Sequence, residues 1–73
     1  MNIIRAYIYI DPLDDIAAED HGWEMGEDIH GRYMTKQFES VKDAEKKAHE
    51  LVDLLFMEVL SVYDVQIIDE SPC

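Results

Sequence analysis

The sequence predicts a small α+β domain, in which a sheet of about three strands, antiparallel or mixed, packs against one main helix. Residues 3–10, IIRAYIYI, and residues 62–68, VYDVQII, are rich in the β-branched and aromatic side chains that strands favour. Between them, residues 40–60 carry apolar side chains at the spacing of one buried helix face. A chain of 73 residues is one domain, 1–73, and is small enough that self-association would help it to bury a core.

The first expected strand ends at Asp11 and Pro12, because proline lacks a backbone donor and fixes φ. Successive side chains of a strand point to opposite faces, so this strand has two different surfaces. The face expected in the core carries Ile4, Ala6, Ile8 and Ile10, and the other carries Ile3, Arg5, Tyr7 and Tyr9. We expect the two tyrosines to contribute to an interface.

Residues 11–31 form an acidic connection that contains no lysine or arginine. Three glycines interrupt it, and residues 13–20 are expected to form a short helical turn. Its eight acidic side chains are Asp11, Asp14, Asp15, Glu19, Asp20, Glu24, Glu27 and Asp28. The lone tryptophan of the chain, Trp23, lies in the same segment and is expected either to plug the core or to anchor a partner.

A second strand is expected over residues 32–38, RYMTKQF, and the helix follows it with Ser40 as N-cap. The expected buried face of the helix carries Val41, Ala44, Ala48, Leu51, Leu55 and Val59. Residues 51–60 contain more apolar side chains than one face needs, so either both sides of the helix are buried or, as we favour, the protein forms a homodimer. The expected dimer interface includes Leu54, Phe56 and Met57, or else Tyr7 and Tyr9. Residues 70–73 are expected to form a tail.

The formal charge of -11 predicts a protein partner with a basic surface and no direct binding to nucleic acid or to anionic membranes. The single cysteine, Cys73, allows no internal disulfide, and no apolar stretch approaches the roughly 20 residues of a membrane span. These features predict a soluble, cytoplasmic protein.

No catalytic residue, metal site or cofactor is expected. The spacing from Asp11 fails the calcium-loop pattern, because the third and sixth positions are Leu13 and Ile16. His21, Glu24, Asp28 and His30 lack the spacing that holds a transition metal, so solvated loop histidines are the preferred interpretation. The chain has no glycine-rich phosphate loop, and Ser40 is explained by capping. An enzyme is therefore not predicted.

The acidic segment has two interpretations, a solubilising surface and a binding surface. A charge of -11 exceeds what solubility needs in a small domain, and self-repulsion destabilises the fold, so binding is favoured. Carboxylates two residues apart on a strand lie roughly 6–7 Å apart, which suits them to imitate the phosphates of DNA. Seven further acids would extend such a stripe if they shared its face: Asp43, Glu50, Asp53, Glu58, Asp64, Asp69 and Glu70.

In size, acidity and lack of catalytic residues the chain resembles the DNA-mimic proteins that phages make against host DNA-binding proteins. That group includes inhibitors of restriction enzymes and of the nucleoid protein HU. The resemblance implies a phage-encoded inhibitor of a basic host protein. Our hypothesis is that the eight acids of residues 11–28 stand in for phosphates and occupy the DNA-binding surface of that protein. The run FESVKDAEKKAHELV with VYDVQIIDESPC is also similar to small phage inhibitors of bacterial RNA polymerase. The alternative is therefore an inhibitor of RNA polymerase or of a nuclease effector complex that binds through Trp23 and the tyrosines as well as charge.

Overall fold

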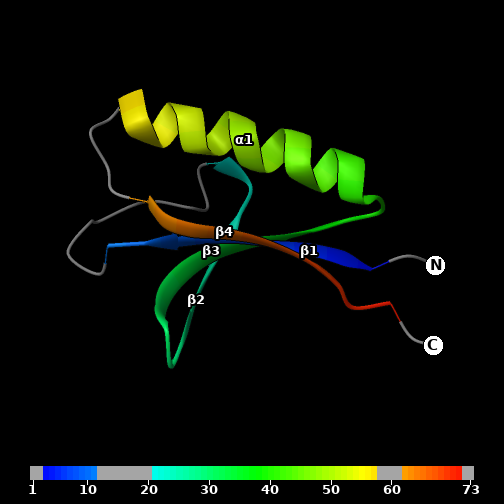
Figure 1. Ribbon diagram of the computed structural model, residues 1–73, viewed down its shortest axis with the longest axis horizontal. Helices are drawn as coiled ribbons and strands as arrows, with labels where there is room; N and C mark the ends of the chain where they lie inside the picture. The colour runs from blue at the N-terminus through cyan, green and yellow to red at the C-terminus, as the bar shows by residue number, and fades with distance from the viewer. Residues whose placement is uncertain (1–2, 12–20, 58–61, 72–73) are drawn as a thin grey trace.

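The computed structural model describes residues 3–11, 21–57 and 62–71. It contains five elements: β1 (Ile4–Ile10), β2 (Glu24–Asp28), β3 (Gly31–Phe38), α1 (Val41–Met57) and β4 (Val62–Asp69). The strands form one antiparallel sheet in the order β2-β3-β1-β4, and α1 lies along one side of it (Figure 1). The predicted α+β class is confirmed, but the sheet has four strands and not about three.

The additional strand, β2, lies inside the segment predicted to be a connection. Its sequence, EMGED, contains no β-branched side chain, so local propensity gives no strand signal. Its pairing is fixed by the hairpin instead. Asp28 pairs with Gly31, which leaves a two-residue turn, and Gly31 has a φ of 123° that favours glycine. The hairpin thus recruits an acidic, glycine-containing segment into the sheet.

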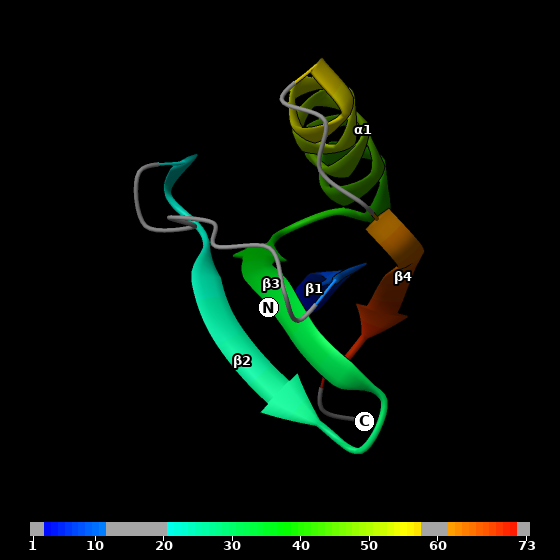
Figure 2. The ribbon, with the colours of Figure 1, turned by 90° about the vertical axis from the view of Figure 1, so that its left-hand side faces the viewer.

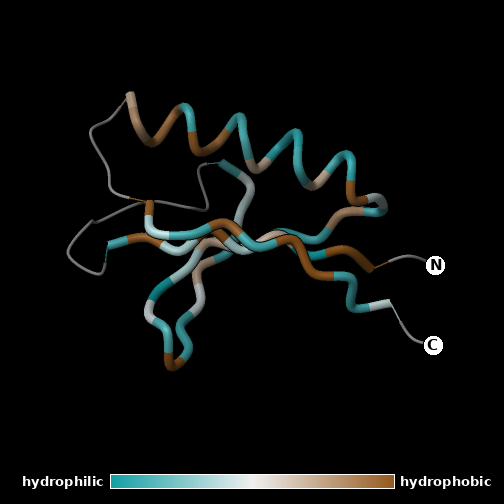
Figure 3. Tube along the Cα trace, in the orientation of Figure 1, coloured by the Kyte–Doolittle hydropathy of each residue, from teal (hydrophilic) through white to brown (hydrophobic). Residues whose placement is uncertain are grey.

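The core lies between β1 and α1. The predicted core face of β1, made by Ile4, Ala6, Ile8 and Ile10, is buried, which confirms that prediction. From the helix, Ala44, Ala48, Leu51 and Leu55 are buried against it. Figure 3 shows the apolar positions of α1 recurring along its length, with polar positions between them.

The helix begins where the sequence predicts. The Asp43 amide donates to Ser40 Oγ at 3.1 Å, and the Ala44 amide donates to the Ser40 carbonyl at 3.1 Å, so Ser40 is the N-cap. Val41 was expected on the buried face, but it is 46% exposed. Being the first helical residue, it precedes the first buried position of α1, Ala44. Val59 lies outside the described residues.

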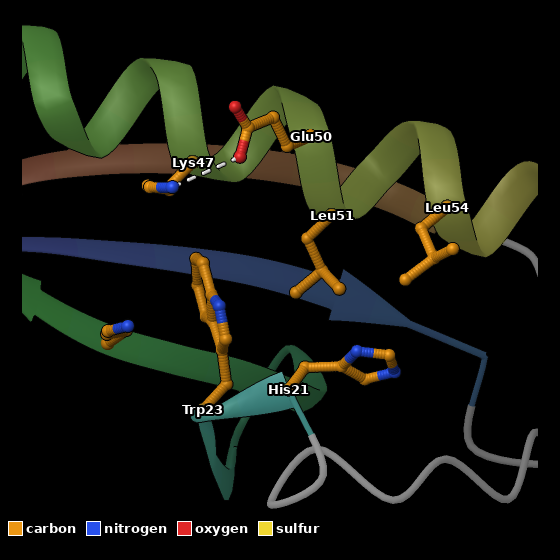
Figure 4. Close-up of a pocket in the computed structure, with 7 residues that line it drawn as sticks. His21, Trp23, Lys47, Glu50, Leu51 and Leu54 are labelled. Carbon is orange, nitrogen blue, oxygen red and sulfur yellow. Dashed lines mark hydrogen bonds and ion pairs between the residues drawn. The ribbon is translucent and has the colours of Figure 1, made fainter.

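Trp23 lies in the core immediately before β2. Its side chain is 5% exposed, and its ring meets Phe38 edge to face at a centroid distance of 5.8 Å. Figure 4 shows the indole directed from the start of β2 toward α1. Of its two expected roles, Trp23 therefore has that of a core plug, and it is not an exposed anchor.

The chain beyond β4 continues to pair with the start of β1. The Glu70 amide donates to the Ile3 carbonyl at 2.7 Å, and the Ile3 amide donates to Ser71 Oγ at 2.7 Å. The first two residues of the expected tail, 70–73, are thus attached to the sheet, and the last two lie outside the described residues. No helix in the described part of the chain is long and apolar enough to cross a membrane.

Candidate functional site

The sheet face opposite α1 is the candidate site, and we call it the open face. In the part of the chain that is described, α1 is the only helix, and it packs against the other face (Figure 2). Cross-strand partners share a face, so the register defines the members of the open face. They are Glu24, Gly26 and Asp28 of β2, Tyr33, Thr35 and Gln37 of β3, Arg5, Tyr7 and Tyr9 of β1, and Asp64, Gln66 and Ile68 of β4.

Three tyrosines pack together at the centre of the open face. The Tyr33 ring meets Tyr7 and Tyr9 edge to face, with centroid distances of 5.2 and 5.5 Å. Thr35 beside them is buried and accepts a hydrogen bond from Arg5 Nη1 at 3.4 Å. The tyrosines that were expected at a dimer interface therefore form a small packed layer within their own chain.

Gly26 makes room for this layer. A Cβ atom at position 26 would lie 2.5 Å from the Tyr33 ring, so the ring would have to move and disturb its contacts with Tyr7 and Tyr9. Glycine in a strand otherwise costs about 0.5–1 kcal/mol relative to alanine. The close approach of the ring accounts for a glycine at this position.

We expect Gly26→Ala to destabilise the fold by about 1–3 kcal/mol, because the added methyl displaces Tyr33. Chemical denaturation followed by circular dichroism measures this change. In a Tyr33→Ala background the same substitution should be neutral or stabilising, since the clash is gone. Equal destabilisation in both backgrounds would show that the ring is not the cause.

Hydrogen bonds hold the carboxylates at the margins of the open face. Tyr9 Oη donates to Asp28 Oδ2 at 2.7 Å, and Tyr7 Oη donates to Glu70 Oε2 at 2.9 Å. Two further acids are held in the same way, since Gln66 Nε2 donates to Asp64 Oδ2 at 3.1 Å and Tyr63 Oη donates to Asp11 Oδ2 at 3.3 Å. Neutral donors thus position Asp28 and Asp64 without cancelling their charge, whereas Glu70 is also paired with Arg5.

The pKa values follow from these bonds. The hydroxyl of Tyr9, with a smaller contribution from the His30 amide, holds the pKa of Asp28 below its usual range. The same bond, with burial of the ring, raises the pKa of Tyr9 to about 12. Burial and the bond to Glu70 raise the pKa of Tyr7. At neutral pH Asp28 is therefore charged, and both tyrosines keep the protons that they donate.

In a Tyr9→Phe variant we expect the pKa of Asp28 to rise toward its ordinary value of about 3.9, because its main donor is lost. Carboxyl chemical shifts in an NMR titration measure it. Because the pKa of Asp28 is lower in the folded than in the unfolded state, ionised Asp28 stabilises the fold at pH values above its unfolded-state pKa. This contribution is lost as the pH falls through the folded-state pKa. Because the pKa of Tyr9 is raised in the folded state, protonated Tyr9 stabilises the fold below about pH 10, and this contribution is lost as the pH rises toward about 12. An unchanged Asp28 titration in Tyr9→Phe would contradict the assignment.

The basic side chains lie mostly away from the open face. All six lysines and arginines fall within the described residues. Lys42, Lys46 and Lys47 are on α1, and Arg32 and Lys36 alternate to the other face of β3. Arg5 is the exception, and its Nε lies 3.4 Å from Glu70 Oε1. The open face therefore carries a marked excess of negative charge.

The acidic residues predicted to bind a partner do not all lie on the open face. Of the eight in the acidic segment, Glu24 and Asp28 lie on the open face, Glu27 points to the other face opposite Arg32, and Asp11 follows β1. Asp14, Asp15, Glu19 and Asp20 lie outside the described residues.

The additional acids that were considered for the stripe are divided as well. Asp64 belongs to the open face, and Glu70 reaches Tyr7 at its edge. Asp69 pairs with the core residue Ile4 and so points to the α1 side. Three more, Asp43, Glu50 and Asp53, lie on α1, away from the open face. Glu58 is outside the described residues.

Among the hollows that flank the sheet, two lie beside the tyrosine layer and the helix. One of about 200 Å³ lies at the open face and is lined by Tyr9, His30, Tyr63, Asp64 and Gln66. The other, of about 250 Å³, lies under α1, where His21 and Trp23 face Leu51, Leu54 and the Lys47–Glu50 ion pair (Figure 4). No group of three His, Cys, Asp or Glu in residues 3–11, 21–57 and 62–71 is arranged to hold a metal ion.

Sequence reasoning missed Tyr33, Gly26 and Ile29 as parts of this surface. The available signal was the spacing of Asp28 and Gly31, which suits a two-residue turn and would have predicted the hairpin. With the hairpin assigned, alternation along β2 and β3 places Gly26 beside Tyr33.

Comparisons with models of protein families, with curated proteins and with solved structures find no match for this chain. The function has to be inferred from the open face itself.

Proposed function

We propose that this protein is a DNA mimic that binds the DNA-binding surface of a basic host protein, such as an HU-like nucleoid protein or a restriction factor, and blocks its access to DNA. The open face is the binding surface, and its carboxylates stand in for phosphates. An inhibitor of this kind acts by occlusion and needs no catalytic group. It would act in the cytoplasm and, as the resemblance implies, be encoded by a phage.

The observation that carries the proposal is the combination of charge and order on the open face. Glu24, Asp28 and Asp64 lie on it with Glu70 at its edge, and Arg5 is the only base there. Tyr7 and Tyr9 at the centre of the face donate to two of these acids, Glu70 beyond β4 and Asp28 on β2. Ordered carboxylates suit this role, because fixing them in advance lowers the entropy lost on binding.

Salt dependence of binding tests the proposal. DNA-binding proteins gain much of their affinity by releasing counterions from phosphates, and each ion pair to a mimic should likewise be weakened by salt. We expect the affinity for the basic partner to fall steeply and linearly in a plot of log K against log salt concentration. A flat plot would contradict DNA mimicry.

The alternative is an inhibitor of RNA polymerase or of a nuclease effector complex that binds mainly through apolar contacts. Exposed apolar side chains at the end of α1, with Phe56 58% and Met57 81% exposed, favour it. Its mark would be affinity that tolerates salt and depends on these side chains. Trp23 is too buried to serve as the contact.

We also propose that the chain forms a homodimer through the end of α1, since Leu54, Phe56 and Met57 are exposed there. Tyr7 and Tyr9 are less suited, because they already pack against Tyr33. In sedimentation equilibrium, Phe56→Ser with Met57→Ser should weaken dimerisation by at least about a hundredfold, because burying each side chain is worth about 1.5–3 kcal/mol. Val41→Ser, an exposed site at the other end of α1, is the control and should have no effect. A wild-type protein that stays monomeric at high concentration would refute the dimer.

A further inference from the structure

Ile29 at the tip of the β2–β3 hairpin is 95% exposed, more than any other large hydrophobic side chain in the described residues. The hairpin projects away from α1 in Figure 1, and Figure 3 shows an apolar position at its tip. Because the side chain is almost fully exposed, it contributes nothing to the core. A hydrophobic group presented in this way is available to a partner.

The tip that presents Ile29 is held in place on both sides. Asp28 Oδ1 accepts a hydrogen bond from the His30 amide at 2.7 Å, and Asp28 Oδ2 accepts one from Tyr9 Oη at 2.7 Å. On the other side, the positive φ of Gly31 closes the turn. The turn is thus fixed to the centre of the open face, and binding through it would cost little conformational entropy.

The turn itself does not require isoleucine. Turn positions favour Gly, Asn, Asp, Ser and Pro, whereas β-branched side chains suit strands. The conformation of this turn is stabilised by the hydrogen bond to Asp28 and by the positive φ of Gly31. The apolar group at position 29 is therefore unexplained by folding, which directs attention to an external contact.

Acidic side chains of β2 lie near the apolar tip. Asp28 precedes Ile29 directly and Glu24 lies on the same face of β2, whereas Glu27 lies on the other face, opposite Arg32. In protein–DNA complexes, phosphate contacts position the protein, while base contacts, including apolar contacts to thymine methyl groups, provide specificity. An apolar group beside ordered carboxylates reproduces both kinds of contact.

We propose that Ile29 occupies the base-contacting surface of the partner, an apolar patch flanked by lysine and arginine side chains. This inference rests on the proposed function, and it narrows the partner to a nucleic-acid-binding protein that contacts bases as well as phosphates. A protein that touches only the phosphate backbone would have no place for Ile29.

The test separates the apolar contact from the charge contacts. The probe is the protein most strongly retained by the immobilised wild-type chain from a nuclease-treated bacterial lysate, identified by mass spectrometry and purified. Its dissociation constant is measured across a salt series for wild type, Ile29→Ser, Ile29→Val and Glu24→Gln. Thermal unfolding confirms that each variant is folded, which the exposure of both positions leads us to expect.

We expect Ile29→Ser to raise the dissociation constant about tenfold or more at every salt concentration without changing the slope, because an uncharged contact releases no counterions. Ile29→Val should stay close to wild type, and Glu24→Gln should reduce the slope. A steep slope with Ile29→Ser unchanged from wild type would overturn the tip contact alone. A flat wild-type slope would overturn the charge mimicry, and retention of no protein at all would overturn both.

Discussion

The triple variant Glu24→Gln, Asp64→Asn and Glu70→Gln should bind the basic partner about a hundredfold more weakly than wild type, or worse. Each substitution removes one negative charge while keeping the size and an acceptor oxygen of the side chain. Hydrogen bonds to charged groups contribute about 1.5–3 kcal/mol each and are roughly twice as strong as neutral ones, so weakening three of them lowers the affinity on the order of a hundredfold. The slope of the salt dependence should fall as well.

A matched variant controls for net charge. Glu39→Gln, Glu45→Gln and Asp53→Asn also remove three charges, but Glu45 and Asp53 lie on α1 and Glu39 lies just before it. This control should lose only the small, long-range part of the attraction. Titration calorimetry of both variants makes the comparison. Equal losses in the two would mean that net charge matters and the open face does not.

The second large effect concerns stability. Trp23→Ala should destabilise the fold by about 3–5 kcal/mol, because it removes a large buried ring that packs on Phe38 and lies under α1. A domain of this size has a total stability of only about 4–11 kcal/mol, so the variant should be partly unfolded at modest temperature. Circular dichroism during thermal unfolding measures the change.

Trp23→Phe and Met57→Ala provide the comparisons for this prediction. Phenylalanine keeps most of the aromatic packing, so its cost should be clearly smaller. Met57 is 81% exposed, and its replacement should change stability by less than about 0.5 kcal/mol. A Trp23→Ala variant as stable as Met57→Ala would contradict the position of the indole in the core.

The parts of the fold that sequence predicts well have strong local patterns. Alternation in β1 identifies its core face correctly, and the Ser40 cap with its apolar repeat identifies α1. In both, the side chains that make the pattern are the ones that become buried. These elements are therefore predictable because their regularly spaced apolar side chains are the ones that the fold buries.

The open face is harder to predict, because its organisation depends on long-range pairing. β2 forms by pairing with β3, although EMGED has little strand propensity of its own. The bond from Tyr7 to Glu70 joins residues 63 positions apart, and only the pairing of β1 with β4 brings them together. Sequence reasoning therefore found the acidic charge but not which acids share a surface.

The central claim is tested most directly by competition with DNA. The purified partner is first bound to the immobilised protein at low salt, and duplex DNA is then added at increasing concentration. Because DNA and this protein would occupy the same surface of the partner, DNA should release the partner completely. The DNA concentration that releases half of the partner should rise or fall with the dissociation constant of DNA for the partner. Formation of a ternary complex, with the partner holding DNA and this protein together, would contradict DNA mimicry by the open face.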